Sequence, residues 1–258
     1  MKRLAVTLFF LAFIPHLHAA VTTKTIEYKQ GDQVLEGYLA WDDATDQLRP
    51  GVLVVHDWMG LGDFAKLRAK KLAEMGYIAF AADIYGKDVR PATPQEAAAA
   101  AGKYKNDCKL MRDRVNAAFD VLRGSPLCDP KRTAAIGYCF GGTCVLELAR
   151  SGAEVAGVVS FHGGLATPNA ADAKNIRGKV LVLHGGDDPH VPPKEVAAFE
   201  QEMRAAGIDW QLIVYGGAVH AFTNPAAGND PSRGAAYNAA ADRRSWEAMK
   251  AFFAEIFK

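Results

Sequence analysis

One cysteine of the chain stands in a sequence context that could make it a nucleophile. Cys139 lies in the segment Gly137–Gly142, which reads G-Y-C-F-G-G, with glycine two positions before the cysteine and two positions after it. This spacing is typical of a nucleophile elbow, a tight strand-to-helix turn in which serine is more common. Such a turn holds its nucleophile in a strained backbone at a helix N-terminus, where thiolates are favoured. The pattern predicts a covalent catalyst; a structural cysteine in a glycine-rich turn is the alternative.

An acid and a base follow the cysteine in the chain order of a hydrolase triad. Asp188 follows one predicted buried strand, and His220 follows the last one. His220 would take the proton of Cys139, and Asp188 would hold the ring in the required tautomer. Asp187 is the rival acid. We favour Asp188 because it lies midway along the chain between the glycine that begins the turn and the valine that ends it. Taken singly, Asp188 could be a turn former and His220 an ordinary loop histidine.

The strands that would position these residues follow from the hydrophobic pattern. Two alternating stretches, Thr23–Tyr28 and Val34–Ala40, are joined through Gly31-Asp32 and predict an antiparallel hairpin. Continuous apolar runs, typical of strands buried on both faces of a parallel sheet, come next. They are Val52–Val55, Tyr77–Ala81, Thr133–Ile136, Val155–Phe161, Val180–Leu183 and Leu212–Tyr215.

Helical patterns fill the intervals between the apolar runs. One begins at Asp63, a possible N-cap, and another opens at Pro192-Pro193 and closes at Gly207. The segment Pro94–Arg123 is mostly helical and is interpreted as a crossover connection, with a small lid as the alternative. The sequence therefore predicts one α/β domain, with a mostly parallel twisted sheet, an antiparallel N-terminal edge and helices on both faces. In such sheets ligands bind off the carboxyl ends of the strands, where the three candidate catalytic residues stand.

Composition excludes several classes of function. The chain has 258 residues, with 30 Lys and Arg against 29 Asp and Glu, so its formal net charge of +1 creates no strong field for nucleic acid or anionic membranes. The basic clusters Lys66–Lys71 and Arg243-Arg244 are interpreted as solvated helix faces. No nucleotide-binding loop is present, and the histidines lack zinc-site spacing. We expect no metal and no cofactor.

The first twenty residues differ from the rest in composition. Lys2 and Arg3 precede the apolar run Leu4–Ile14, and small residues close the segment, as in a secretory signal peptide. An uncleaved anchor is the alternative. We expect residues 1–20 to be removed, leaving a single domain of residues 21–258 in the periplasm or outside the cell, no longer attached to a membrane. Export would permit a disulfide between Cys108 and Cys128, with free thiols as the alternative.

These motifs resemble those of the dienelactone hydrolase family, which has the α/β-hydrolase fold. The resemblance covers roughly Thr23 to Phe257. It rests on Gly137–Gly142, Gly185–Pro192, His220–Phe222, His56–Leu61 and Asp83–Gly86. It implies a Cys-His-Asp hydrolase of esters or lactones that works without a metal. It also implies an oxyanion hole formed by the backbone N–H groups of Phe140 and Trp58, each donor contributing about 2.7–4 kcal/mol.

The sequence departs from the family pattern at three positions. Asp57 stands where the founding lactonases have a glutamate that takes part in activating the nucleophile, and the shorter side chain would need a shifted backbone or a water. Lys87 and Asn224 stand where those enzymes have two arginines that hold a substrate carboxylate, and Arg90 could replace only the first. Because Lys and Asn do not hold a carboxylate as a bidentate Arg does, we expect a neutral or differently charged ester. The candidate substrate-binding residues are Tyr85, Lys87, Arg90, His162, Phe222 and Asn224.

The sequence thus predicts an exported hydrolase of small esters or lactones that forms a thioester on Cys139. Two other classes stay open: a thiol-dependent redox protein, disfavoured because Cys144 is poorly placed to resolve a disulfide, and a non-catalytic binding protein on a hydrolase scaffold. The expected partner is a small-molecule substrate, and the expected state is a monomer or a small homo-oligomer.

Overall fold

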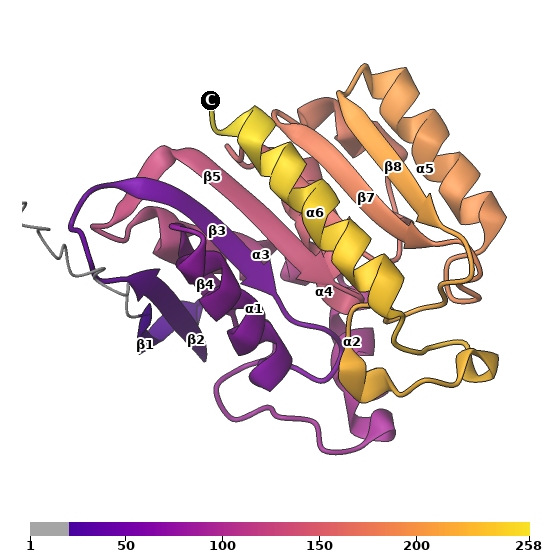
Figure 1. The fold of residues 1–258 in the computed structure, drawn as a ribbon, viewed down its shortest axis with the longest axis horizontal. Coiled ribbons are helices and arrows are strands. Elements are labelled where there is room, and N and C mark those ends of the chain that lie inside the picture. The colour runs from indigo at the N-terminus through magenta and orange to yellow at the C-terminus, as the bar shows by residue number, and fades with distance from the viewer. Residues whose placement is uncertain (1–20) are drawn as a thin grey trace, which may run out of the picture.

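The computed structural model describes residues 21–258, and the predicted signal peptide, residues 1–20, lies outside the described residues. A single eight-stranded sheet crosses the molecule in the order β1-β2-β4-β3-β5-β6-β7-β8 (Figure 1). The strands are β1 (Val21–Gln30), β2 (Gln33–Asp42), β3 (Arg49–Val55), β4 (Ile78–Ala82), β5 (Cys128–Tyr138), β6 (Gly157–Phe161), β7 (Lys179–Gly185) and β8 (Trp210–Tyr215). β1 and β2 pair antiparallel, β2 pairs antiparallel with β4, and every later pair is parallel. The predicted parallel sheet with an antiparallel N-terminal edge is confirmed.

Helices cover both faces of the sheet, as the alternating pattern predicts. They are α1 (Asp63–Glu74), α2 (Pro94–Lys105), α3 (Cys108–Arg123), α4 (Phe140–Arg150), α5 (Pro193–Ala206) and α6 (Ala239–Ile256), with 3-10 turns η1 (Ala170–Asn175), η2 (Pro225–Ala227) and η3 (Pro231–Arg233). α1 and α6 pack on one face, in front of the sheet in Figure 1, and α2 to α5 pack on the other. The central strands are apolar on both faces because each face is buried under helices.

Two local expectations need correction, and a third is confirmed in more detail. Asp63 lies in the first turn of α1 and does not cap it; Gly62 occupies the N-cap, with no side-chain hydrogen bond. The segment Pro94–Arg123 is mostly helical, as expected, and forms two helices, because Asp107 caps the second one by accepting from Leu110 N–H. The cluster Lys66–Lys71 is not wholly solvated: Arg68 is buried, with only 4% of its surface exposed.

The cysteines flanking α3 are free thiols. Cys108 Sγ donates a hydrogen bond to Glu147 Oε2 at 3.0 Å, and Cys128 is buried beneath Leu122 and Gly51. Burial and the neighbouring Glu147 carboxylate raise the pKa of the Cys108 thiol to about 11. The structure therefore has free thiols at Cys108 and Cys128 and no disulfide between them. Within residues 21–258, no helix combines the length and the apolar character needed to cross a bilayer.

Candidate active site

The elbow around Cys139 joins the end of β5 to the start of α4. Cys139 is the N-cap of α4 and has φ of 53°, a conformation that non-glycine residues rarely adopt. The flanking glycines are required by close approach of the backbone. A side-chain carbon on Gly137 would collide with the Gly141 carbonyl, and one on Gly141 would collide with the Val55 carbonyl. The two glycines therefore allow the chain to turn tightly here and to place the cysteine just beyond the carboxyl end of β5.

The structure brings Cys139, His220 and Asp188 together in one hydrogen-bonded row. His220 Nε2 lies 3.0 Å from Cys139 Sγ, and His220 Nδ1 lies 2.8 Å from Asp188 Oδ2. The second oxygen of Asp188 accepts the backbone N–H of His190 at 2.8 Å. Asp187, the rival acid, is exposed and has no part in this row. This arrangement has the geometry of a nucleophile, a base and an orienting acid.

The charges of the row are coupled. Burial disfavours an ionised Asp188, but the hydrogen bond and charge of His220 outweigh burial and lower the pKa of the carboxyl. Burial likewise disfavours an imidazolium, but hydrogen bonds to Asp188 and Cys139 outweigh it and raise the pKa of His220 to about 10. His220 is therefore a ring that holds a proton firmly between a carboxylate and a sulfur atom.

The raised pKa of His220 predicts a dependence of stability on pH. The folded protein binds this proton more tightly than the unfolded chain, whose histidine titrates near 6.5. The stabilisation is therefore complete below about pH 6.5 and is lost as the pH rises toward about 10. Urea unfolding from pH 6 to 10 should show the difference in free energy of unfolding between wild type and His220→Gln shrinking as the pH rises. Parallel curves for the two proteins would contradict the assignment.

Two backbone N–H groups, one following Cys139 in the chain and one in the loop after β3, have no acceptor in the described part of the chain. They belong to Phe140, the first residue of α4, and to Trp58, in the loop after β3. The Phe140 N–H also stands at the positive end of the helix dipole. These are the groups that the family resemblance implies for the oxyanion hole.

Two buried aromatic side chains hold the Trp58 loop in place. His56 Nδ1 lies 2.5 Å from the Asp57 carbonyl, and because His56 Nε2 accepts the Ile84 N–H, the ring proton sits on Nδ1. In a trans peptide the carbonyl and the next N–H point opposite ways, so this contact directs the Trp58 N–H away from His56. The hydroxyl of Tyr85 donates to the Trp58 carbonyl at 3.0 Å.

Asp57 does not hydrogen-bond to Cys139. Its Oδ1 accepts the Met59 N–H at 2.9 Å, and its Oδ2 lies 3.3 Å from Asn224 Nδ2. The shorter side chain, relative to the family's glutamate, is thus engaged within its own loop and with Asn224. The structure supplies no direct route by which Asp57 would activate the thiol, so this expectation stays without geometric support.

The candidate substrate-binding residues divide into those near the row and those engaged elsewhere. Lys87 pairs with Glu27 of β1, and Arg90 donates to the carbonyls of Gly86 and Val89. Neither cation hydrogen-bonds to a triad residue. The remaining candidates are Tyr85, which supports the Trp58 loop, Phe222, which is buried in the core, Asn224, which bonds to Asp57, and His162, whose ring lies 5.3 Å from that of His220.

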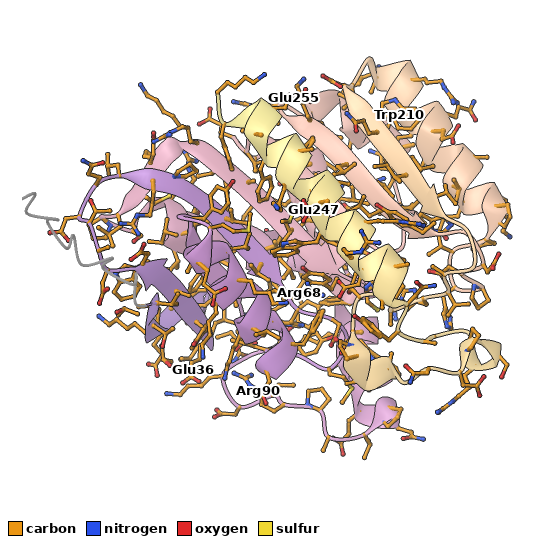
Figure 2. All side chains as sticks on the ribbon, viewed as in Figure 1. Glu36, Arg68, Arg90, Trp210, Glu247 and Glu255 are labelled. Carbon is orange, nitrogen blue, oxygen red and sulfur yellow. The ribbon has the colours of Figure 1, made fainter. Side chains whose placement is uncertain are left out.

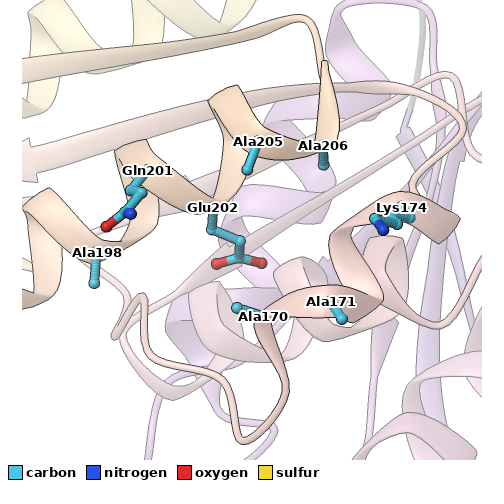
Figure 3. A pocket seen from close by; sticks show the side chains of 8 residues that line it. All are labelled: Ala170, Ala171, Lys174, Ala198, Gln201, Glu202, Ala205 and Ala206. Carbon is cyan, nitrogen blue, oxygen red and sulfur yellow. The ribbon is translucent and has the colours of Figure 1, made fainter.

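Two cavities open near the helices on the α2–α5 side. One, of about 250 Å³, is lined by Lys105, Cys108, Met111, Thr143, Glu147, Gly164, Ala166, Pro168, His190 and Glu195. Its residue His190 lies with its ring 5.1 Å from that of His220, so this cavity borders the triad. A second, of about 370 Å³, lies between α5 and η1 and is lined mainly by alanine (Figure 3). It contains no triad residue, and its carboxylate, Glu202, is paired with Arg150.

Sequence reasoning did not single out Thr223 or Arg68, and it treated His56 as an ordinary strand-end histidine. The signal for His56 was present, since it directly follows a buried strand in the resembling motif, but its role depends on a contact with Ile84, in the segment after β4. Among residues 21–258, the structure contains no group of three or more His, Cys, Asp and Glu side chains that could hold a metal ion.

The sheet order, the elbow after β5 and the acid and histidine after β7 and β8 define the α/β-hydrolase fold. Comparison with known proteins narrows this class. The model of the dienelactone hydrolase family matches residues 35–257, and the chain belongs to this family. A solved dienelactone hydrolase-like promiscuous phosphotriesterase from metagenomic libraries is 42% identical, covers 93% of this chain and 100% of its own, and superposes with a TM-score of 0.89.

More distant relatives agree with this assignment. A putative carboxymethylenebutenolidase of Salmonella typhimurium is 26% identical over 88% of this chain and 84% of its own length. A solved putative dienelactone hydrolase from Klebsiella pneumoniae, 23% identical, covers 91% of this chain and 99% of its own with a TM-score of 0.75, and supports the fold. The chain is thus a hydrolase-family protein, which implies a small-molecule substrate.

Proposed function

We propose that this protein hydrolyses small, uncharged carboxylic esters or lactones through a thioester on Cys139. The observation that carries the proposal is the row in which His220 lies 3.0 Å from the sulfur and 2.8 Å from Asp188. Membership of a hydrolase family supports the reaction class. The nucleophile, the intermediate and the substrate are our inference from the geometry.

In the first half of the reaction, the acyl group of the substrate is transferred to the sulfur of Cys139. His220 holds the thiol proton, Cys139 Sγ forms a bond to the carbonyl carbon, and the π electrons of the carbonyl move to its oxygen. The oxyanion accepts hydrogen bonds from the free N–H groups of Phe140 and Trp58. As the carbonyl re-forms, the ester C–O bond breaks and His220 delivers its proton to the departing alkoxide. The products are an alcohol and a thioester.

In the second half, water replaces the sulfur. Neutral His220 takes a proton from a water molecule as its oxygen attacks the thioester carbonyl, and the same two N–H groups hold the second oxyanion. The C–S bond then breaks, the acid leaves, and the proton on His220 balances the released thiolate. Asp188 stays ionised throughout and stabilises the imidazolium. The enzyme returns to its starting state.

The polar groups near the row favour an uncharged substrate. A substrate carboxylate placed beside the Trp58 loop would meet the Asp57 carboxylate, and Asn224 offers it an amide that already bonds to Asp57. Lys87 and Arg90 are engaged with their own neighbours. A free carboxylate would therefore be repelled without the bidentate arginine contact that would compensate.

Phosphotriester hydrolysis is a second candidate, favoured by one observation: a solved relative 42% identical over its whole length is described as a promiscuous phosphotriesterase. A phosphotriester is also uncharged, and attack at phosphorus develops a negative oxygen that the same N–H groups could hold. Thiol-dependent redox chemistry has less support, because neither candidate for a resolving cysteine is available. Cys144 is buried in α4, and Cys108 is hydrogen-bonded to Glu147.

A substrate panel tests the proposal. Wild type and Cys139→Ala are assayed with p-nitrophenyl acetate, the neutral lactone dihydrocoumarin, a p-nitrophenyl hemisuccinate that carries a carboxylate, and the phosphotriester paraoxon. We expect wild type to turn over the two neutral carbonyl substrates best and Cys139→Ala to turn over none. Iodoacetamide labelling of Cys139 without any turnover would instead favour a redox or binding role, and higher kcat/KM for paraoxon would favour the second candidate.

We also propose that the protein is exported, because a basic start followed by a short apolar run is typical of a secretory signal peptide. N-terminal sequencing of the protein from a periplasmic fraction should find a chain that begins near residue 21. An intact N-terminus in the cytoplasmic fraction would contradict export.

A further inference from the structure

Strained backbone is concentrated at the candidate site. Among residues 21–258, only three residues other than glycine have positive φ: Cys139 at 53°, His162 at 41° and Ala221 at 58°. Cys139 is the proposed nucleophile, Ala221 directly follows the proposed base, and the His162 ring lies between them, 5.3 Å from the ring of His220. Such conformations cost on the order of 1–3 kcal/mol each and persist only where surrounding contacts hold them.

His162 contacts both of these strained segments through its ring nitrogens. The backbone N–H of Cys139 is shared between the Phe161 carbonyl at 3.0 Å and His162 Nδ1 at 3.2 Å. His162 Nε2 lies 2.8 Å from Thr223 Oγ1. Because Nδ1 is an acceptor, the proton of a neutral ring sits on Nε2 and is donated to the threonine hydroxyl. Burial, together with the charge of His220, lowers the pKa of His162 well below the usual range, so the ring is neutral. His162 is 2% exposed, and each of its ring nitrogens has a hydrogen-bond partner.

Thr223 is itself fixed from the opposite side. It is fully buried, and its carbonyl accepts from Arg68 Nη2 of α1 at 2.8 Å. The same nitrogen donates to Asp242 of α6 at 2.7 Å. Arg68 lies where α1 meets the N-terminal part of α6 (Figure 2). The loop that carries His220 is thus tied to two helices on one face of the sheet.

We propose that His162 and Thr223 are positioning residues that clamp the Cys139 elbow to the His220 loop and so set the distance between sulfur and imidazole. The inference rests on the proposed function, since a clamp matters for turnover only if Cys139 and His220 react. The His162–Thr223 contact links positions 61 residues apart, one directly after β6 and one in the loop after β8. Neither residue is placed to touch the reacting atoms. Their contribution is to hold the Cys139 elbow and the His220 loop in fixed positions relative to each other.

The first test removes the threonine hydroxyl. Thr223→Val keeps the shape of the side chain but leaves the His162 Nε2–H without an acceptor. We expect kcat for p-nitrophenyl acetate to fall about tenfold with KM within twofold, and Thr223→Ser, which retains the hydroxyl, to restore most of kcat. Thr133→Val is the matched control: Thr133 is also buried, but its hydroxyl has no hydrogen-bond partner within residues 21–258, so the same change should leave kcat unchanged. Wild-type kcat in Thr223→Val, with circular dichroism showing a folded protein, would overturn the clamp.

The second test breaks the same bridge from the other side. In His162→Asn the side-chain oxygen can still accept the Cys139 N–H, but the side chain is too short to reach Thr223, and asparagine tolerates positive φ. If one bridge is responsible, the double variant His162→Asn/Thr223→Val should lose no more kcat than the worse single variant. Losses that multiply would show independent effects and would overturn the proposal.

A spectroscopic test does not depend on turnover. Nitrogen-15 spectra of the imidazoles, assigned with His162→Asn, should show His162 as a neutral ring protonated on Nε2 from pH 5 to 8. A ring protonated on Nδ1, or a charged ring in this range, would overturn the proposed hydrogen-bond pattern. The two proposals fail differently: turnover by Cys139→Ala removes the proposed function, whereas an inactive Cys139→Ala with a fully active Thr223→Val removes only the clamp.

Discussion

His220→Gln is expected to lower kcat/KM for p-nitrophenyl acetate by roughly 10⁴-fold. The ring contacts both Cys139 Sγ and Asp188, and no other side chain of the described chain hydrogen-bonds to that sulfur. Glutamine can fill part of the space, but it cannot take a proton from the thiol or return one to the alkoxide. Both halves of the reaction therefore lose their proton carrier. Iodoacetamide labelling of Cys139 at pH 7 should also become slower, because the sulfur loses the partner that holds its proton.

His190→Gln is the matched control for this variant. Its ring lies 5.1 Å from that of His220, so it shares the local environment, yet it hydrogen-bonds to neither Cys139 nor His220. We expect its kcat/KM to stay within a few-fold of wild type. Comparable losses in the two variants would show that the effect comes from general disturbance of the loop and would contradict the assignment of the base.

Asp188→Asn is expected to lower kcat by about 10³- to 10⁴-fold while KM changes little. The carboxylate holds the His220 Nδ1–H and also accepts the His190 N–H. An amide can turn its NH₂ toward Nδ1, which would place the ring proton on Nε2, facing the sulfur. That tautomer cannot accept the thiol proton. Because the side-chain volume is nearly unchanged, the variant should stay folded, which circular dichroism checks.

The neighbouring aspartate supplies the control here. Asp187→Asn makes the same chemical change one residue earlier, on an exposed side chain outside the row. Its kcat should equal that of wild type within about twofold. An equal loss in both variants, or a pH profile of Asp188→Asn that matches wild type, would show that Asp188 does not orient His220.

Much of the fold could be predicted because its signals are local. The alternating hairpin, the continuous apolar runs and the proline and glycine at the two ends of α5 each depend on neighbouring residues, and each lies where the pattern indicates. The helical content of Pro94–Arg123 could be predicted, but the exact break between α2 and α3 depends on capping. What ends α2 is the turn at Asn106 and the cap supplied by Asp107. Arg68 was misjudged because its burial depends on α6, a distant helix that supplies Asp242.

The triad residues could be named from sequence because each lies in the turn that follows a strand, and the carboxyl ends of parallel strands lie on the same side of the sheet. The supporting residues could not. His56 accepts the N–H of Ile84, in the segment after β4, and His162 contacts Thr223, which lies 61 residues further along the chain. No spacing in the sequence marks either contact. The expected substrate-binding cations were carried over by position, but Lys87 is turned toward β1, where Glu27 neutralises it.

The central claim is that Cys139 carries the acyl group during turnover. Wild type is mixed with p-nitrophenyl acetate, quenched in acid within the first turnovers, and analysed by mass spectrometry of the intact protein and its peptides. We predict one added acetyl group, located on the peptide that contains Cys139, released by hydroxylamine and absent from Cys139→Ala. Steady turnover with no acyl group on Cys139, or with the acetyl group on another residue whose removal abolishes activity, would contradict the account.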